Sequence, residues 1–397
     1  MMRYRTLLLT LLACLLLTPA YASSVSPAAF QALAKAQELV QKSEWQQAHS
    51  ALDAILSAHA KEPYALATAL QLKGYILNET GKHAEALQAF EQVLALGALE
   101  SSAEQQILYN VAQLLASVGR QKEAAARITT WLAHYPTPTP AQQIQAAWIF
   151  LGAQQFAAAA TQIEAALRSV EGRPEESWYQ MLILALQGTE NHASLKQWLP
   201  LVIEHYPNNK NYWMQLTSTY LNTQERQKAV AAISTAYHNG LLREESDIRY
   251  AVQLYLHAGV PHKAARVLSD ALERGIVLSD AKHYEQLADI WFHAREMGTA
   301  TQAFHKALEH GAGHETSLKL GRMLVQQQEW HAAREHLQRA ARSEHERTKS
   351  EALILLGMAA YSEGNMAEAR DAFGQARRFG KVRRQAEGWL KYLQQEG

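Results

Sequence analysis

The chain has 397 residues, and its 38 basic and 38 acidic side chains give a formal net charge of zero. With 48% hydrophobic residues it is too apolar for a disordered chain, and its single Cys cannot form an intrachain disulfide. The neutral charge balance argues against a broad surface for nucleic acid. Alanine is unusually common, with 68 residues, and this excess calls for a structural reason.

The first residues predict an export signal. Two arginines precede an apolar run at 7–17, and a proline and the sequence Ala-Tyr-Ala at 20–22 follow it. A run of this length rises only about 16 Å as a helix, well short of the ~30 Å core of a bilayer. We therefore interpret residues 1–22 as a secretory signal peptide cleaved between Ala22 and Ser23, which places the mature chain in the periplasm.

An alternative concerns Cys14. The sequence Leu-Leu-Ala-Cys at 11–14 resembles a bacterial lipoprotein cleavage site, which would leave a lipidated Cys14 as the N-terminus. Three leucines follow Cys14, whereas a lipidated cysteine is usually followed by a polar linker. No later stretch reaches 18 consecutive apolar residues. We therefore expect membrane association only through a partner or, in this alternative, through Cys14.

The rest of the chain contains an internal repeat. Its clearest element is an alanine, then a large residue four positions later and a small one three positions after that, as in Ala369, Phe373 and Ala376. The first position of this element recurs about every 36 residues. We call these ten places the register positions: Ala48, Ala86, Ala124, Ala159, Leu195, Ala229, Ala264, Ala300, Ala333 and Ala369. The pattern resembles the tetratricopeptide repeat (TPR).

Each repeat has the pattern of two amphipathic helices joined by a polar or glycine-containing turn. Gly81, Gly119, Gly259 and Gly364 occupy equivalent places at the end of a first helix, where a left-handed cap favours glycine. We expect an all-α protein, a right-handed α-solenoid of about ten helix-turn-helix units. The N-terminal units span 27–136, the central and C-terminal units span 137–380, and a capping helix occupies 381–397. Prolines at 136, 138 and 140 predict a stiff connector, Pro136–Pro140, which is either a rigid turn or a hinge.

Motifs for catalysis, cofactors and metals are missing. The sequence contains no P-loop, G-x-S-x-G, H-E-x-x-H or C-x-x-C motif, and its 17 histidines are scattered. We therefore expect no catalytic residue, no cofactor and no metal site. The densest charge run is Arg377, Arg378, Lys381, Arg383 and Arg384. It either complements a helix dipole or faces an anionic partner or lipid headgroups.

The resemblance also implies a binding surface. In TPR proteins the first helix of each unit lines a groove that binds protein, which implies a non-catalytic scaffold or adaptor. The residues at groove positions are Met214, Ser218, Arg249, Gln253, Glu285, Asp289, Phe292, Arg322, Met358 and Tyr361. Their mixed charge, amide and aromatic groups suit an extended peptide or a partner helix. The Asn/Lys pattern of carboxylate-clamp members is missing at these positions.

A narrower resemblance covers Asn211–Gln395. This stretch is similar to the exported TPR proteins that accompany TonB-type energy-transduction systems in marine gammaproteobacteria. It rests on Tyr212-Trp213, Gly259-Val260-Pro261, Ile290-Trp291 and Gln385-Ala386. The resemblance implies a periplasmic accessory of iron–siderophore transport, whose partners include envelope transport-complex components.

Two alternatives stay open. One is an accessory in cell-envelope biogenesis or outer-membrane assembly. The other, from a different class, is a helical-array enzyme acting on the cell wall. Such an enzyme needs a paired acid and base, for which Glu285 and Asp289, four residues apart on one predicted helix face, are the nearest candidates.

Overall fold

The computed structural model describes residues 25–135 and 137–395. Within these ranges the chain forms 21 helices and no strand, and the helices follow one another as ten pairs and a last single helix. The expected α-solenoid of about ten helix pairs with a terminal capping helix is therefore confirmed. The predicted signal peptide with its cleavage site at Ala22 and Ser23, Cys14, and Pro136 of the proposed hinge lie outside the described residues.

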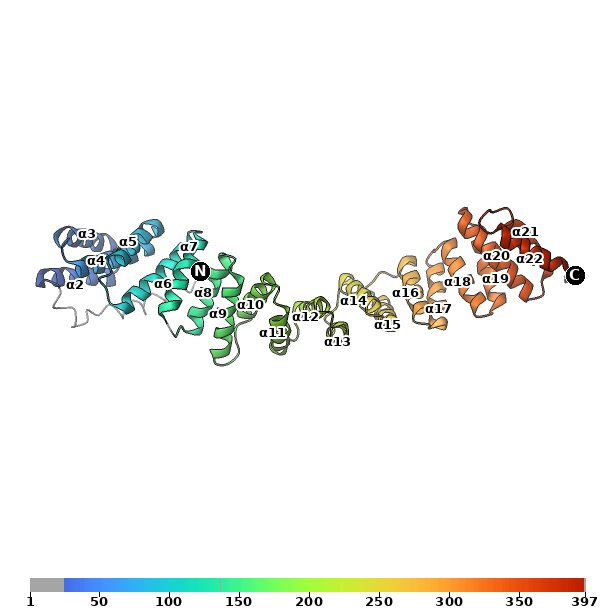
Figure 1. Ribbon diagram of the computed structural model, residues 1–397, viewed down its shortest axis with the longest axis horizontal. Helices are drawn as coiled ribbons and strands as arrows, with labels where there is room; N and C mark the ends of the chain where they lie inside the picture. The colour runs from blue at the N-terminus through green and yellow to red at the C-terminus, as the bar shows by residue number, and fades with distance from the viewer. Residues whose placement is uncertain (1–24, 136, 396–397) are drawn as a thin grey trace. The chain divides into compact units, whose positions relative to one another are not determined.

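The chain divides into two compact units, of which the first ends at Tyr206 and the second begins at Pro207 (Figure 1). The helix pairs of the first unit are α2 (Pro27–Gln41) with α3 (Trp45–Ala58), α4 (Pro63–Glu79) with α5 (His83–Leu96), α6 (Ser101–Ser117) with α7 (Gln121–His134), α8 (Pro140–Gly152) with α9 (Phe156–Ser169), and α10 (Glu176–Gly188) with α11 (His192–His205). The domain boundary expected at residue 136 stays a prediction.

The second unit contains five more pairs and the last helix. They are α12 (Lys210–Asn222) with α13 (Arg226–His238), α14 (Glu245–His257) with α15 (Pro261–Glu273), α16 (Ala281–His293) with α17 (Met297–Glu309), α18 (His314–Gln326) with α19 (Trp330–Ala340), α20 (Glu346–Ser362) with α21 (Met366–Ala376), and α22 (Arg383–Gln395). In each pair the two helices lie side by side and contact each other.

Local sequence explains where several helices begin. Thr139 caps α8: its hydroxyl accepts the backbone N–H of Gln142 at 3.3 Å, and the Gln142 side chain accepts the backbone N–H of Thr139 at 2.9 Å. Pro140 then takes the first helical position, where its missing N–H costs nothing and its fixed φ suits a helix. Pro63 and Pro261 open α4 and α15 in the same way.

The register residues take the same place in every pair. Each is the fourth residue of the second helix. The nine alanines are completely buried and Leu195 is 2% exposed. Small side chains there let the two helices approach closely, so the helix–helix register accounts for these nine alanines.

The turn inside each pair also recurs. The residue two positions before the second helix has a positive φ in all ten pairs, between 52° and 83°. Four of these residues are the glycines predicted to cap a first helix. The other six carry side chains: Ser43, Gln154, Glu190, Gln224, Arg295 and Gln328. The sequence pattern did not reveal them, since a left-handed turn is expected from glycine and not from glutamine or arginine.

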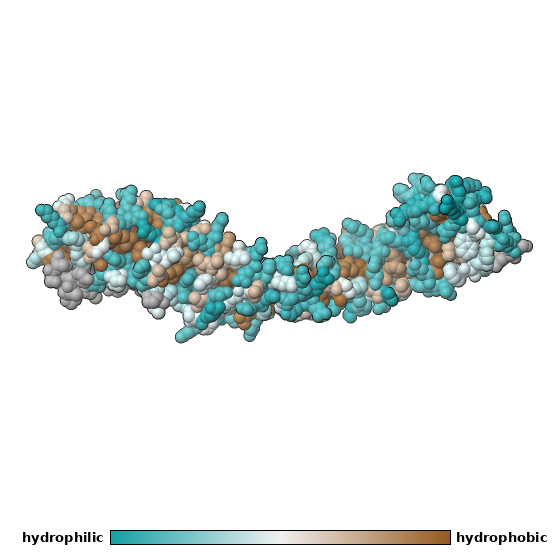
Figure 2. Space-filling view, viewed as in Figure 1, coloured by the Kyte–Doolittle hydropathy of each residue, from teal (hydrophilic) through white to brown (hydrophobic). Residues whose placement is uncertain are grey.

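First helices lie on the inner side of each stack. Some helices of the described chain also contact the next helix but one. The more extensive of these contacts all join first helices: α2 with α4, α6 with α8, α8 with α10, and α18 with α20. First helices therefore lie closer together than second helices do. Figure 2 shows that hydrophobic residues reach the surface in patches over both units, among largely hydrophilic residues.

The last helix covers the end of the second unit. α22 packs on α21, where Ala386 and Leu393 are buried and Trp389 and Leu390 are partly buried against the same core. The expected capping helix is thus confirmed, although it begins two residues later than the segment predicted from Lys381.

Candidate functional site

The ten side chains predicted to line a groove all lie on first helices of the second unit, and none of them is buried. Five of them share one place, eleven residues before the register residue of their pair: Ser218, Gln253, Asp289, Arg322 and Met358. Equivalent places in consecutive repeats lie along one face of the stack. Half of the candidates therefore share one repeat place on their first helices, and the role of all ten in binding stays a prediction.

The acid/base candidates Glu285 and Asp289 on α16 are joined by a lysine of the next repeat. Lys319 Nζ on α18 lies 2.8 Å from a carboxylate oxygen of Glu285 and 2.9 Å from one of Asp289. The Thr316 hydroxyl donates to Glu285 at 2.9 Å. Burial acts to lower the pKa of Lys319, but the hydrogen bonds to the two carboxylates outweigh it and raise the pKa above its usual value. The two carboxylates thus form a bridge between neighbouring repeats.

A second bridge follows one repeat later. The guanidinium of Arg322 on α18 lies 2.6 Å from a carboxylate oxygen of Glu351 on α20, and Lys381 approaches the other oxygen at 3.6 Å. Part of the basic cluster is therefore occupied in holding the array together. Arg378 and Arg384 are not: among the described residues neither side chain has a hydrogen bond or an ion pair.

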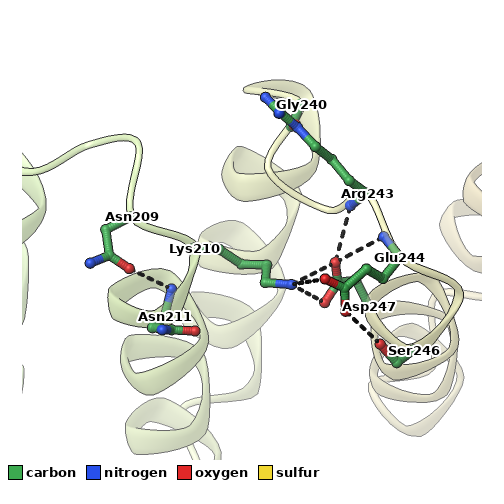
Figure 3. Close-up of polar contacts among 8 residues, drawn as sticks. All are labelled: Asn209, Lys210, Asn211, Gly240, Arg243, Glu244, Ser246 and Asp247. Atoms are coloured by element: carbon green, nitrogen blue, oxygen red, sulfur yellow. Dashed lines mark hydrogen bonds and ion pairs between the residues drawn. The ribbon is translucent and has the colours of Figure 1, made fainter.

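The most buried carboxylate among the described residues lies in the first turn of α14. Asp247 is 5% exposed and accepts both hydrogen bonds of Lys210 Nζ, at 2.9 and 3.0 Å (Figure 3). It also accepts the backbone N–H groups of Arg243 at 3.0 Å and Glu244 at 3.1 Å. The hydrogen bond with Asp247, set against partial burial, raises the pKa of Lys210. The Asp247 carboxylate therefore has all its hydrogen-bond partners within the protein. Its pair with Lys210 joins α12 to α14.

The first unit has an apolar inner face that the sequence pattern did not reveal. Trp148 on α8 and Leu184 on α10 are 50% and 53% exposed, and both lie eleven residues before their register residue. They therefore occupy the same repeat place as Asp289 and Arg322. α8 has no charged residue, and α8 and α10 contact each other. Counting back from Ala159 and Leu195 would have found both residues, which otherwise look like core.

An aromatic cluster closes the inner face of the second unit. Tyr361 on α20 meets Trp389 and Tyr392 on α22, with ring centroids 5.6 and 5.8 Å apart, and the two tyrosine hydroxyls lie 3.3 Å from each other. The three rings line a cavity of about 400 Å³ together with Arg384, Gln385 and Gly388. The predicted groove residue Tyr361 thus belongs to a hollow at the end of the array.

Among the residues that the structure describes, no three His, Cys, Asp or Glu side chains gather in a way that could hold a metal ion. None of the described helices combines the length and the apolar character needed to cross a bilayer.

Comparison with known families assigns part of the helix pairs to a repeat family. The sequence model of the tetratricopeptide repeat family matches residues 33–101 and 318–381, about a third of the chain. These two segments carry tetratricopeptide repeats. The helix pairs between them have the same left-handed turn and an equivalent register position, occupied by alanine in all pairs but one. No curated protein matches the sequence.

Several solved structures resemble parts of the TPR array. MamA is 17% identical and the match covers 44% of this chain and 94% of MamA, with a TM-score of 0.34. YrrB, described as a TPR protein with an unusual peptide-binding site, is 14% identical over 49% of this chain and 97% of its own, with a TM-score of 0.35. The Cut9–Hcn1 hetero-tetramer of the APC/C is 12% identical over 91% and 83%, with a TM-score of 0.30.

Proposed function

We propose that the chain is a non-catalytic scaffold that binds protein partners along the inner faces of its first helices. The observation that carries the proposal is the half-exposure of Trp148 and Leu184 at one repeat place on adjacent first helices. Large apolar side chains left open side by side are typical of a protein-binding surface. Their neighbours on α8 are amides and aliphatic residues, which suit an apolar stripe of a peptide or helix.

The inner face of the second unit offers different chemistry to the same kind of partner. Its side chains are a mixture of charged, polar and aromatic groups, and several of the charged ones are bridged, as Lys319 is to Glu285 and Asp289. These ion pairs stay partly exposed. Charged groups of this kind contribute more to the choice of partner, through charge complementarity, than to the affinity for it.

The finer proposal concerns location and partner. The chain is a periplasmic accessory of a TonB-dependent transport system for iron–siderophore complexes, and its partners are envelope components of that system. The support is the signal peptide predicted at 1–22 and the residues between Asn211 and Gln395 that resemble exported TPR proteins of such systems. In the lipoprotein alternative the same scaffold is tethered through Cys14.

Site-specific crosslinking tests the scaffold. A photoreactive phenylalanine analogue replaces Leu184 on the inner face or, as a matched control, Leu201 on the second helix α11, which is similarly exposed at 48%. We expect discrete crosslinked proteins from position 184 and none of them from position 201. Identical crosslinks from both positions, or none from either, would contradict binding through the inner face.

Cell fractionation tests the location separately. We expect the chain in the osmotic-shock fluid, shortened to begin at Ser23, and the Cys14→Ser variant to fractionate in the same way. Incorporation of labelled fatty acid that is lost in Cys14→Ser would instead establish the lipoprotein alternative. Crosslinks to proteins of other systems would refute the TonB assignment while leaving the scaffold intact.

A further inference from the structure

The cavity beside α22 combines three aromatic rings with an unpaired cation. Tyr361, Trp389 and Tyr392 line it together with Arg384. Trp389 is fixed from behind, because its ring stacks on the buried Phe373 with centroids 5.3 Å apart and planes 4° apart. Tyr392 is 43% exposed, so part of this aromatic wall is open to solvent. The site is therefore an open depression, wide to solvent, with room for one or two side chains.

The fold does not use the Arg384 charge. Arg383 and Arg384 lie in the first turn of α22, where the helix dipole disfavours cations. Helix electrostatics therefore cannot account for them, in contrast to Arg377, which follows the end of α21. The side chain of Arg384 has no hydrogen bond or ion pair among the described residues. A guanidinium without a carboxylate, at the mouth of an aromatic hollow, is suited to an external anion.

The surrounding charge has the same sign. Between 377 and 395 the chain has six cationic side chains and a single carboxylate, Glu387. Glu387 does not line the cavity. This excess is local, because the whole chain is neutral. Charge complementarity therefore favours an acidic ligand at this end of the second unit.

We propose that this cavity binds an acidic peptide segment of a partner protein, which seats one aromatic or aliphatic side chain against Trp389 and Tyr392 and pairs a neighbouring carboxylate with Arg384. The proposal rests on the protein-binding scaffold above and names one of its sites. A peptide is favoured over a lipid surface because Tyr361, one of the predicted groove residues on the first helix α20, also lines this depression.

Fluorescence anisotropy with the full chain tests the proposal. The probe is a fluorescein-labelled peptide of alternating aspartate and phenylalanine. The comparison peptides replace every aspartate by lysine or every phenylalanine by serine. We expect saturable binding of the first peptide alone. Arg384→Gln should weaken it about tenfold, the effect of losing a charge-assisted pair. Tyr392→Ala should weaken it to a similar extent.

Arg378→Gln is the matched control, since it removes the same exposed charge from the same cluster but does not line the cavity. Equal weakening by Arg378→Gln and Arg384→Gln would overturn the proposal in favour of diffuse attraction. Full affinity in Arg384→Gln would also overturn it. Binding to vesicles of phosphatidylcholine and phosphatidylserine in equal parts, without binding of the peptide, would assign the cluster to lipid instead. In each of these cases crosslinking at position 184 still decides the scaffold by itself.

Discussion

Gly357 on α20 and Phe373 on α21 meet so closely that a Cβ on Gly357 would lie 2.6 Å from Cε1 of the Phe373 ring. The same arrangement joins Gly74 to Phe90 in the first unit, again at 2.6 Å, and a leucine replaces the ring opposite Gly321. In all three pairs the glycine lies twelve residues before the register alanine, and the large residue lies four after it. This contact sets how closely the two helices of a pair pack.

We therefore predict that Gly357→Ala destabilises the last pair by about 1–3 kcal/mol, because the new methyl overpacks against a buried ring. Gly374→Ala in α21 is the matched control. Nothing lies within 4 Å of its added Cβ, so it should stabilise by up to about 1 kcal/mol through helix propensity. Urea denaturation, monitored by hydrogen exchange of the backbone amides in α20 and α21, measures the change in unfolding free energy of both variants. Equal signs for the two variants would refute the contact.

The recurring left-handed turn predicts opposite effects at one structural position. Gly259→Ala should cost about 1 kcal/mol, because its φ of 73° is strained for any residue with a Cβ. Gln224→Gly, one pair earlier, should gain about 0.5 kcal/mol, since glycine relieves the strain but loses more freedom on folding. Hydrogen-exchange rates of α12 to α15 report both. A gain from Gly259→Ala would contradict the turn.

The buried carboxylate predicts an asymmetry between two partners of Lys210. Asp247→Ala should destabilise the second unit by about 3 kcal/mol, because Lys210 and two backbone N–H groups lose their acceptor. Glu244→Ala removes a carboxylate whose side chain is 70% exposed and 3.6 Å from Lys210, and should cost below about 1 kcal/mol. Equilibrium unfolding in urea compares them. Similar losses would show that Asp247 is not the anchor.

His336 predicts a pH dependence. Burial is the main cause that lowers its pKa, and the nearby His305, with ring centroids 5.1 Å apart, and Arg339 lower it further against the opposing effect of Glu335. The unfolded chain binds a proton as the pH falls through about 6.5, whereas the folded chain binds it only at lower pH. Stability should therefore decrease as the pH falls from about 6.5 towards the folded pKa.

Thermal melts at about pH 7.5 and about pH 5.5 measure this decrease, and it should be smaller in His336→Gln than in the unmodified chain. The exposed His238, also on a second helix, gives the control variant His238→Gln, which should keep the full decrease. An unchanged pH dependence in His336→Gln would show that His336 is not responsible.

The sequence predicted the repeat well because its strongest constraint is steric. A buried place with no room for a Cγ demands alanine nine times in ten, so Ala48 to Ala369 are visible as a period. The turns were predictable only where they contain glycine. Gly81 is recognised from its residue type, whereas Gln154 adopts the same left-handed backbone and its residue type does not indicate it. Pairings such as Lys319 with Glu285 were not predictable, since many charges on neighbouring helices could have paired.

The groove residues stay a prediction, and the sequence pattern found only part of the repeat place they share. Asp289 and Arg322 lie at that place on their first helices, and the apolar Trp148 at the same place was missed. In a helix as apolar as α8, periodicity does not separate a core residue from an exposed one. The cavity at Arg384 required the structure, because it forms only where α20 and α22 meet.

Because the left-handed turn recurs at the same place in all ten pairs, the helix pair is the structural unit that can be added or removed without disturbing the others. Gain or loss of one whole repeat of about 36 residues keeps the turn, the buried alanine and the inner-face residue in phase for every other pair. An insertion of any other length within a pair moves an inner-face residue such as Leu184 off its place. The array can therefore lengthen or shorten its binding surface only in whole steps, and each step adds one further side chain for a partner to contact.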